Sequence, residues 1–258
     1  MLTVDDLHIQ IGSQTLARAI NFTLVPGQIT AILGPNGTGK STLLKTLFGE
    51  IKLNAGRIRH EQDTLSHKTL AQWQHRFGYM PQDTQLDINL SVLEVILLGQ
   101  LGALNLRLDD QILQQAVDIL ANMGLSHLAN RDVSTLSGGQ RQMVLFAQAL
   151  MRDPKIMMLD EPVSALDLHH QHVLLDHLRE KTREKGYITL MVLHDLNLAA
   201  QYADNLLVLK EGDLIASGKP EKILTVQLVE QVYNVQAQVF TDASGIPFVR
   251  TVRSNKAA

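Results

Sequence analysis

The chain has 258 residues, of which 45% are hydrophobic and 19% are charged, with a net charge of −3 and no cysteine. The small acidic excess argues against a protein whose main role is to grip nucleic acid. No apolar run has the length and purity needed to cross a bilayer, because the richest stretch, 90–108, contains Glu94, Gln100, Asn105 and Arg107. The N-terminal sequence MLTVDDLHIQ lacks the features of a signal peptide, and the absence of cysteine fits a reducing cytosol.

The first part of the chain predicts antiparallel strands that lead into a glycine-rich loop. Residues 2–11 and 19–25 alternate apolar and polar positions, and a Pro-Gly turn precedes an apolar strand at 29–33. The motif GPNGTGKST follows at once, and a helical pattern then runs to Gly49. A strand, a glycine-rich loop and a helix in this order indicate a P-loop.

A P-loop holds a polyphosphate through its backbone N–H groups at the N-terminus of a helix. The glycines permit the tight turn, Lys40 reaches the β- and γ-phosphates, and Ser41 ligates Mg²⁺. The alternative is a chance glycine-rich loop. The predicted nucleotide-binding residues of the loop are Gly34, Pro35, Asn36, Gly37, Thr38, Gly39, Lys40, Ser41 and Thr42.

Helical periodicity dominates the next part of the chain. Ser91-x-x-Glu94 has the pattern of a capping box, and a helix is expected over 109–123. That helix places on one face the apolar residues Ile112, Leu113, Ala116, Val117, Leu120 and Met123. We interpret residues 83–150 as a helical insertion.

The remaining segments complete an α/β fold. Apolar runs at 156–159 and 188–193 lack alternation, as strands of a parallel sheet covered on both faces do. A hairpin is expected at 206–217, a helix at 226–233 and a strand at 246–252. We predict a single domain with a P-loop, RecA-like core, a mostly parallel sheet covered by helices on both faces, and an antiparallel β part. The core spans 1–82 and 151–225, the inserted helical subdomain 83–150, and a short C-terminal extension 226–258.

Two carboxylates follow the apolar strand at 156–159. In P-loop proteins, an aspartate in the position of Asp160 holds Mg²⁺. Glu161 is then available to orient or deprotonate the attacking water. The alternative is an acidic pair that merely ends a strand before Pro162.

The sequence LSGGQ at 136–140 precedes an apolar helix. Ser137-x-x-Gln140 is itself a capping-box pattern, which is one explanation of these residue types. Two adjacent glycines at a helix N-terminus also leave the backbone open to an anion. Together with GPNGTGKST, MMLDEP and the segment SALD at 164–167, this sequence resembles the signature of the ATP-binding-cassette (ABC) ATPases.

The resemblance implies roles for further residues. Gln82 matches the Q-loop glutamine at the Mg²⁺ and water site, and His194 matches the switch histidine that contacts the γ-phosphate. Asp167 matches the D-loop aspartate near the seam of a homodimer. The signature residues Ser137, Gly138, Gly139 and Gln140 are expected to complete the ATP site of the opposite subunit. The implied catalytic residues are Lys40, Gln82, Glu161 and His194, and the implied metal-site residues are Ser41, Gln82 and Asp160.

Base recognition departs from the family pattern. Members commonly carry an aromatic residue before a glycine in the N-terminal sheet, whereas this chain has Ile11-Gly12. An aliphatic side chain cannot stack on adenine in the same way. Arg18 is the alternative group to lie over the base, unless it is simply a solvated strand residue.

Four histidines, His169, His170, His172 and His177, cluster after the SALD segment. Helical spacing brings His169 near His172, and His172 near Asp176, an arrangement that permits weak chelation. The alternative is a polar outer face of a helix, since a selective metal site requires more ligands in fixed geometry.

The C-terminal half resembles importer ATPases for iron(III)-siderophore complexes, haem and vitamin B12, from the sequence VLHDLNLAAQYADNLLVLKEGDLIASGKPEKILT onward. The resemblance implies a homodimer at the cytoplasmic face of the inner membrane, two permease subunits, an indirect substrate-binding protein and no nucleic acid. Apolar residues near 83–110, such as Leu86, Ile88 and Leu90, are expected to contact the permease, the alternative being that Leu86 and Ile88 belong to the core. Alternatives are a soluble ABC ATPase that acts on ribosomes or DNA, and a nucleotide-gated module without turnover. The sequence does not identify the transported ligand.

Overall fold

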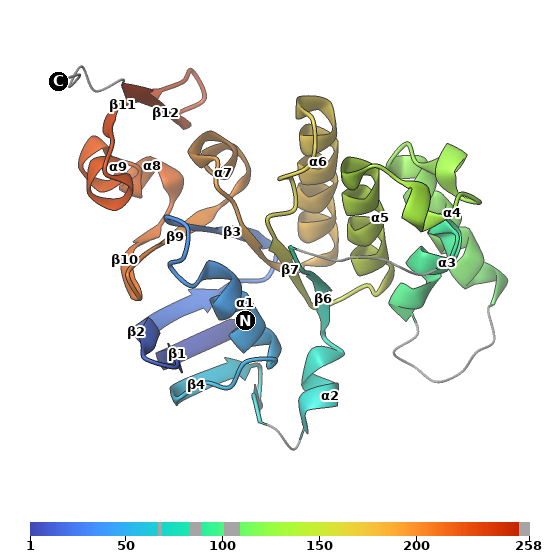
Figure 1. The fold of residues 1–258 in the computed structure, drawn as a ribbon, viewed down its shortest axis with the longest axis horizontal. Helices are drawn as coiled ribbons and strands as arrows, with labels where there is room; N and C mark the ends of the chain where they lie inside the picture. The colour runs from blue at the N-terminus through green and yellow to red at the C-terminus, as the bar shows by residue number, and fades with distance from the viewer. Residues whose placement is uncertain (67–68, 83–88, 101–108, 253–258) are drawn as a thin grey trace.

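The computed structural model describes residues 1–66, 69–82, 89–100 and 109–252 (Figure 1). Its strands are β1 (Leu2–Ile11), β2 (Gln14–Leu24), β3 (Gln28–Leu33), β4 (Ala55–His60), β5 (Asp63–Thr64), β6 (Phe77–Met80), β7 (Ile156–Asp160), β8 (Ile188–Val192), β9 (Asn205–Lys210), β10 (Asp213–Gly218), β11 (Gln236–Thr241) and β12 (Pro247–Val252). Its α-helices are α1 (Lys40–Phe48), α2 (Leu70–Gln74), α3 (Val92–Leu97), α4 (Asp110–Asn122), α5 (Gly138–Met151), α6 (Leu168–Lys185), α7 (Leu196–Tyr202), α8 (Pro220–Ile223) and α9 (Val226–Tyr233). Short 3₁₀ helices lie at Leu98–Gln100, Ser126–Leu128 and Val133–Thr135.

The central sheet determines which loops meet. Its strand order is β10-β9-β3-β8-β7-β6, and only the edge strand β10 is antiparallel to its neighbour. Parallel strands direct their carboxyl ends to the same edge of a sheet. The loops that follow β3, β6, β7 and β8 therefore lie together, and they carry the P-loop, Gln82, Glu161 and His194.

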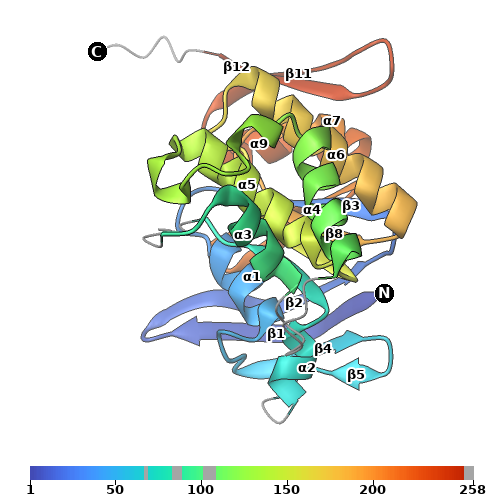
Figure 2. The same cartoon turned by 90° about the vertical axis from the view of Figure 1, so that its right-hand side faces the viewer.

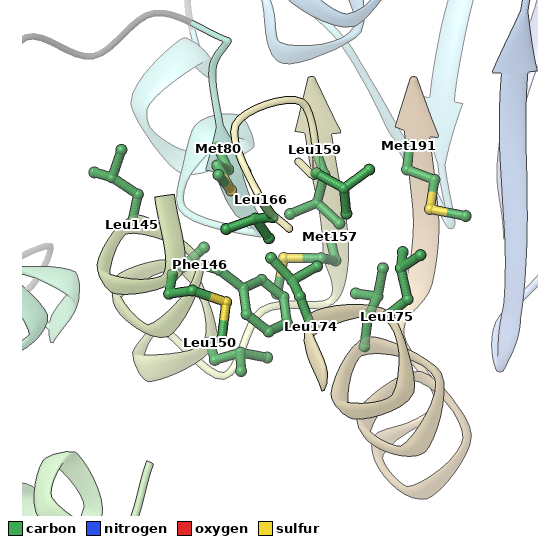
Figure 3. Close-up of a cluster of buried hydrophobic side chains, with 14 of the residues drawn as sticks. Met80, Leu145, Phe146, Leu150, Met157, Leu159, Leu166, Leu174, Leu175 and Met191 are labelled. Atoms are coloured by element: carbon green, nitrogen blue, oxygen red, sulfur yellow. The ribbon is translucent and has the colours of Figure 1, made fainter. Parts of the chain in front are cut away.

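Both faces of this sheet are buried, which explains its unalternating apolar strands. On one face, side chains of β7 and β8 pack against α5 and α6, as Figure 3 shows for Phe146, Met157, Leu174 and Met191. On the other face, the sheet packs against α1 and an antiparallel sheet of order β2-β1-β4-β5. In both views the β2-β1-β4-β5 sheet lies at the bottom of the molecule and the β11–β12 hairpin at the top (Figures 1 and 2). The predicted α/β class is confirmed, with one refinement: the second face is covered by a helix together with a sheet.

The helices α3, α4 and α5 pack on one another, which is consistent with the helical subdomain predicted at 83–150. The boundaries of that subdomain, of the core and of the C-terminal extension stay predictions. The predicted capping box is present, because Ser91 Oγ accepts a hydrogen bond from the Glu94 backbone and the Glu94 side chain accepts one from Ser91 N–H. In the described residues, no helix combines the length and apolar character needed to span a bilayer.

Three sequence expectations need correction. The second strand begins at Gln14 rather than 19, because its first residues pair with the end of β1. The neighbouring helices cover only part of the apolar face predicted for α4. Leu113 and Val117, which belong to that face, are 40% and 41% exposed. The strands β4, β5, β6 and β11 were not expected from the sequence. In β11 only Ala237 is buried, and the segment forms a strand through its pairing with β12.

Candidate nucleotide-binding site

The P-loop between β3 and α1 has a backbone that only glycine adopts without strain. Gly37 and Gly39 have φ angles of +79° and +91°, in the left-handed region. At Gly34 (φ +148°), an added Cβ would lie 2.2 Å from the carbonyl oxygen of Leu209. Gly39 caps α1 without a side-chain hydrogen bond, so the first N–H groups of the helix are not taken up by a cap. This end of the helix is suited to bind phosphate.

Lys40 is held inside this loop. Its Nζ donates hydrogen bonds to the carbonyl oxygens of Gly34 (2.9 Å) and Pro35 (2.8 Å). Thr38 Oγ1 also donates to the Pro35 oxygen, at 2.9 Å. Burial lowers the pKa of Lys40, while the nearby carboxylates of Glu161 and Asp160 oppose this change. The ammonium group is thus already desolvated and positioned before a phosphate enters.

Asp160, at the end of β7, faces the first turn of α1. Its Oδ1 accepts a hydrogen bond from Ser41 Oγ at 3.0 Å, and its side chain is buried. Burial raises the pKa of Asp160, the Ser41 hydrogen bond lowers it, and the charge of Glu161 raises it further. A bound cation would stabilise the ionised form of such a carboxylate.

The donor set around Asp160 fits Mg²⁺. Ser41, Asp160 and Gln82 supply hydroxyl, carboxylate and amide oxygens, the hard ligands that this ion prefers. The buried hydroxyl of Tyr79, on the neighbouring strand β6, has no hydrogen-bond partner among the described residues. Burial, followed by the charge of Asp160, raises the pKa of Tyr79. The charges of Lys45 and Lys40 lower the pKa of Asp160, so positive charge already lies near this carboxylate and a bound cation would add to it.

Glu161 adopts a strained backbone conformation beside His194. Its φ angle is +52°, in a region that costs a non-glycine residue about 1–3 kcal/mol. Its carbonyl oxygen accepts hydrogen bonds from Gln142 Nε2 (2.8 Å) and Ser164 Oγ (3.1 Å), which hold this conformation. The carboxylate Oε1 lies 2.5 Å from His194 Nε2. The adjacent ends of β7 and β8 thus bring the two predicted catalytic residues into contact.

Gln142 was not expected from the sequence. It is a buried amide within the apolar helix α5, and its Oε1 also accepts a hydrogen bond from the Ala165 backbone at 3.1 Å. A buried polar residue in an apolar helical run is the sequence signal that identifies such a position. Gln142 therefore connects the signature helix to the backbone of Glu161.

One cleft of about 500 Å³ collects nine of the 20 predicted site residues, including all four predicted catalytic residues. It is lined by Gln14, Leu16, Asn36, Gly37, Gly39, Lys40, Ser41, Thr42, Gln82, Glu161 and His194. The structure thus brings together the P-loop, the Q-loop glutamine, the acidic residue and the switch histidine. Gln14 and Leu16 were missed because β2 was predicted to begin after them.

The signature residues face a different cleft, of about 730 Å³. Ser137, Gly138, Gly139 and Gln140 line it together with Asp167, and it shares no lining residue with the P-loop cleft. The capping box is present as well, with Ser137 Oγ 3.2 Å from Gln140 N. A Cβ on Gly139 would lie 3.0 Å from the carbonyl oxygen of Ala165, so this helix end packs closely on the D-loop. The LSGGQ residues therefore cap the helix α5 and also line an open cleft, so the two explanations of these residue types are compatible with each other.

Ile11 and Arg18 do not line the P-loop cleft. Arg18 is bound to the turn after β9: its Nη2 donates to the Glu211 carbonyl oxygen at 2.6 Å, and its Nε lies 3.7 Å from Asp213 Oδ1. Ile11 is 49% exposed and pairs directly with Gln14 across the β1–β2 hairpin. Directly opposed residues share one face of a sheet, so position 11 lies beside a residue that lines the cleft. The roles of Ile11 and Arg18 in base recognition stay predictions.

Replacing Ile11 with tyrosine should tighten ATP binding. A ring at this position would lie on the same face as Gln14 and supply a stacking surface, which contributes roughly 1–3 kcal/mol per base in nucleic-acid complexes. We expect a gain at the low end of that range, and we expect GTP to be a fair substitute for ATP in the wild type. Calorimetry with both nucleotides measures these effects. Strong adenine selectivity that is unchanged in Ile11→Tyr but lost in Arg18→Ala would instead assign base recognition to Arg18.

The histidines after the D-loop have separate partners. His170 Nδ1 lies 2.8 Å from Asp167 Oδ1, His172 Nδ1 lies 2.7 Å from the Tyr202 hydroxyl, and His177 Nε2 lies 2.7 Å from the Asn122 carbonyl oxygen. Within the described ranges, no group of three or more His, Cys, Asp or Glu side chains is arranged to hold a metal ion. The geometry therefore gives no support to the metal interpretation.

Comparison with known proteins agrees with these motifs. The family model described as ABC transporter matches residues 17–164. The chain belongs to the ABC transporter family. As an ABC ATPase, it is an enzyme that binds and hydrolyses ATP, which confirms the activity expected from the sequence.

Two relatives and one solved structure resemble this ABC ATPase over nearly its whole length. It is 42% identical over 244 residues to the hemin import ATP-binding protein HmuV of Photobacterium damselae subsp. damselae, covering 92% of this chain and 91% of that protein. It is 36% identical over 250 residues to the ferric enterobactin transport ATP-binding protein FepC of Escherichia coli (strain K12), covering 95% and 92%. A transporter described as of the metal-chelate type, in an inward-facing conformation, matches with a TM-score of 0.83 and 29% identity, covering 98% and 97%.

Proposed function

We propose that this ABC ATPase energises the import of an iron chelate, haem or cobalamin. The relatives named for hemin import and ferric enterobactin transport support the first two ligand classes. The observation that carries the enzymatic part of the proposal is the contact between Glu161 and His194 at the P-loop cleft. The carboxylate of Glu161 and the imidazole of His194 are the two side chains that a hydrolytic site requires beside the phosphates. Their presence argues against a nucleotide-gated module without turnover.

In the proposed mechanism, the P-loop N–H groups and Lys40 bind the phosphates of ATP. Mg²⁺, when bound by Ser41, Asp160 and Gln82, supplies positive charge that offsets the charge of the β- and γ-phosphates. Glu161 orients the attacking water and accepts its proton, and His194, beside it, contacts the γ-phosphate. The short distance between Glu161 and His194 fixes the carboxylate next to the position of the water.

We propose further that two chains close face to face. The separation of the signature cleft from the P-loop cleft supports this arrangement, because the signature residues of one chain do not reach its own P-loop. In the closed homodimer, Ser137 and Gly139 would contact the γ-phosphate bound to the partner. Gly138 and Gln140 would line the same site, and Asp167 would lie near the seam. Each ATP is then held by two helix N-termini, α1 of one chain and α5 of the other.

The proposed partners are two integral-membrane permeases, with a substrate-binding protein acting indirectly, and the proposed location is peripheral, on the cytoplasmic face of the inner membrane. Residues near 83–110 remain the proposed permease contact. Leu86 and Ile88 lie outside the described residues, whereas Leu98, within them, is 37% exposed. The charge of −3 gives no support to nucleic acid as a partner.

Uptake into proteoliposomes tests this function. The ATPase is co-expressed with the permeases encoded next to its own gene, and the complex is reconstituted into proteoliposomes that enclose ATP. Only complexes whose ATPase faces the vesicle interior can then use the nucleotide. We expect ATP-dependent uptake of one ligand among haem, ferric siderophores and cobalamin, and none with Glu161→Gln. Failure to associate with any permease, together with co-sedimentation with ribosomes or DNA, would favour the soluble alternative.

A further inference from the structure

The C-terminal segment 226–252 packs against the helix that follows His194. Val229 of α9, Ala237 of β11 and Val249 of β12 form a small core, and Leu196 of α7 packs against it. Figure 1 shows α7, α8 and α9 as a group beneath the β11–β12 hairpin. This segment therefore packs against the helix that begins just after His194, although none of its residues lines the P-loop cleft.

One side chain, Asn197, fastens α7 to the hairpin. Its Oδ1 accepts a hydrogen bond from the backbone N–H of Val249 at 2.8 Å, and its Nδ2 donates one to the Val249 carbonyl oxygen at 3.2 Å. The amide thus bonds to β12 as the backbone of a third strand would. Both backbone groups of Val249 point away from β11, because in an antiparallel pair alternate residues leave their N–H and C=O groups on the outer edge.

This attachment lies one helical turn from the switch histidine. Asn197 is the second residue of α7, and the cap residue Asp195 accepts hydrogen bonds from the backbone N–H groups of Asn197 (2.7 Å) and Leu198 (3.1 Å). His194 immediately precedes Asp195. A short, hydrogen-bonded stretch of backbone therefore connects β12 to the residue that contacts Glu161.

The same segment also packs against the core of the central sheet, through Val232 and Tyr233. The phenol oxygen of Tyr233, at the end of α9, is buried and has no hydrogen-bond partner among the described residues. Burial raises the pKa of Tyr233 to about 12. Lys210 Nζ adds a third connection, because it donates to the Gln231 carbonyl oxygen at 2.6 Å.

We propose that Asn197 is a positioning residue, through which the β11–β12 hairpin holds His194 in place for ATP hydrolysis. This inference rests on the role of His194 given above. The hairpin fixes the first turn of α7, α7 fixes the backbone of His194, and the imidazole then stays 2.5 Å from Glu161 and directed at the phosphate site. A displacement of about 1 Å in a catalytic group is enough to cost up to a hundredfold in rate. The C-terminal segment therefore contributes to turnover and not only to stability.

The test compares amide-to-leucine changes at two positions of α7. Asn197→Leu keeps the branching and the number of side-chain heavy atoms but cannot bond to Val249, whereas Gln201→Leu also replaces an amide with leucine, on an exposed part of the helix. For Asn197→Leu we expect kcat to fall about tenfold, with the KM for ATP changed less than about twofold, because the P-loop is untouched. Asn197→Asp keeps the acceptor for Val249 N–H and loses the donor, so its kcat should be intermediate. Gln201→Leu should match the wild type.

The result is measured as kcat and KM of the full chain at a temperature below the melting transition of every variant. A lower melting temperature in Asn197→Leu with wild-type kcat would overturn the proposal, because it would show a purely structural contact. A raised KM with unchanged kcat, or a wild-type kcat in Asn197→Asp, would also overturn it. The variant His194→Ala distinguishes the catalytic role of His194 from the positioning role of Asn197. Full activity in His194→Ala would show that the proposed role of His194 is wrong. An inactive His194→Ala together with a fully active Asn197→Leu would show that only the positioning role of Asn197 is wrong.

Discussion

Replacing Glu161 with glutamine should abolish ATP hydrolysis while ATP binding is preserved. The amide has the same shape and can still form a hydrogen bond with His194 Nε2, which lies 2.5 Å from the carboxylate, but it cannot accept a proton from water. General-base catalysis contributes about 10²–10⁴-fold, so the residual rate should be at least a hundredfold lower. Because ATP would then persist at the site, it should trap a closed dimer.

Phosphate release measures the first part of this prediction, and size-exclusion chromatography with Mg-ATP measures the second. Glu221→Gln, an exposed residue of α8, makes the same chemical change away from the cleft and should behave as the wild type. A Glu161→Gln variant that binds ATP yet stays monomeric would count against the shared-site arrangement. Full activity in this variant would remove Glu161 from the catalytic residues.

Lys40→Ala and Ser137→Arg should each be inactive alone but active when mixed. Lys40 is enclosed by the P-loop carbonyls of its own chain, and Ser137 lies on the separate signature cleft. In a mixed dimer, one ATP meets an intact P-loop and an intact signature, and the other meets neither. With random pairing and independent sites, half of the dimers carry one good site, so the rate should reach at most about a quarter of the wild-type value.

The mixing experiment needs a control for folding, since Ser137 also caps α5. Loss of such a cap costs about 0.5–2 kcal/mol, so the melting temperature of Ser137→Arg should be compared with that of Ser137→Ala. Heterodimers are confirmed by two different affinity tags. If confirmed heterodimers never exceed the summed rates of the separate variants, the signature does not act in trans.

The sequence alone determined the features that depend on neighbouring residues. The P-loop is recognised from its glycines, the strand before it and the helix after it, and all three lie within one short segment. Both capping boxes, at Ser91 and at Ser137, were predicted because a cap joins residues only three apart. The apolar strands β7 and β8 were predicted because burial on both faces of a parallel sheet leaves its mark on each strand separately.

The tertiary structure decided which of these segments meet. Strand order places the loops after β7 and β8 side by side, and only this order brings Glu161 to His194 and leaves the signature on another cleft. The bonds from Gln142 to Glu161 and from Asn197 to Val249 join residues far apart in the chain, and no local pattern encodes their partners. The engagement of Arg18 with the turn after β9 is equally non-local. Periodicity and capping report the environment of each segment, whereas catalytic geometry arises from contacts between segments, which packing alone selects.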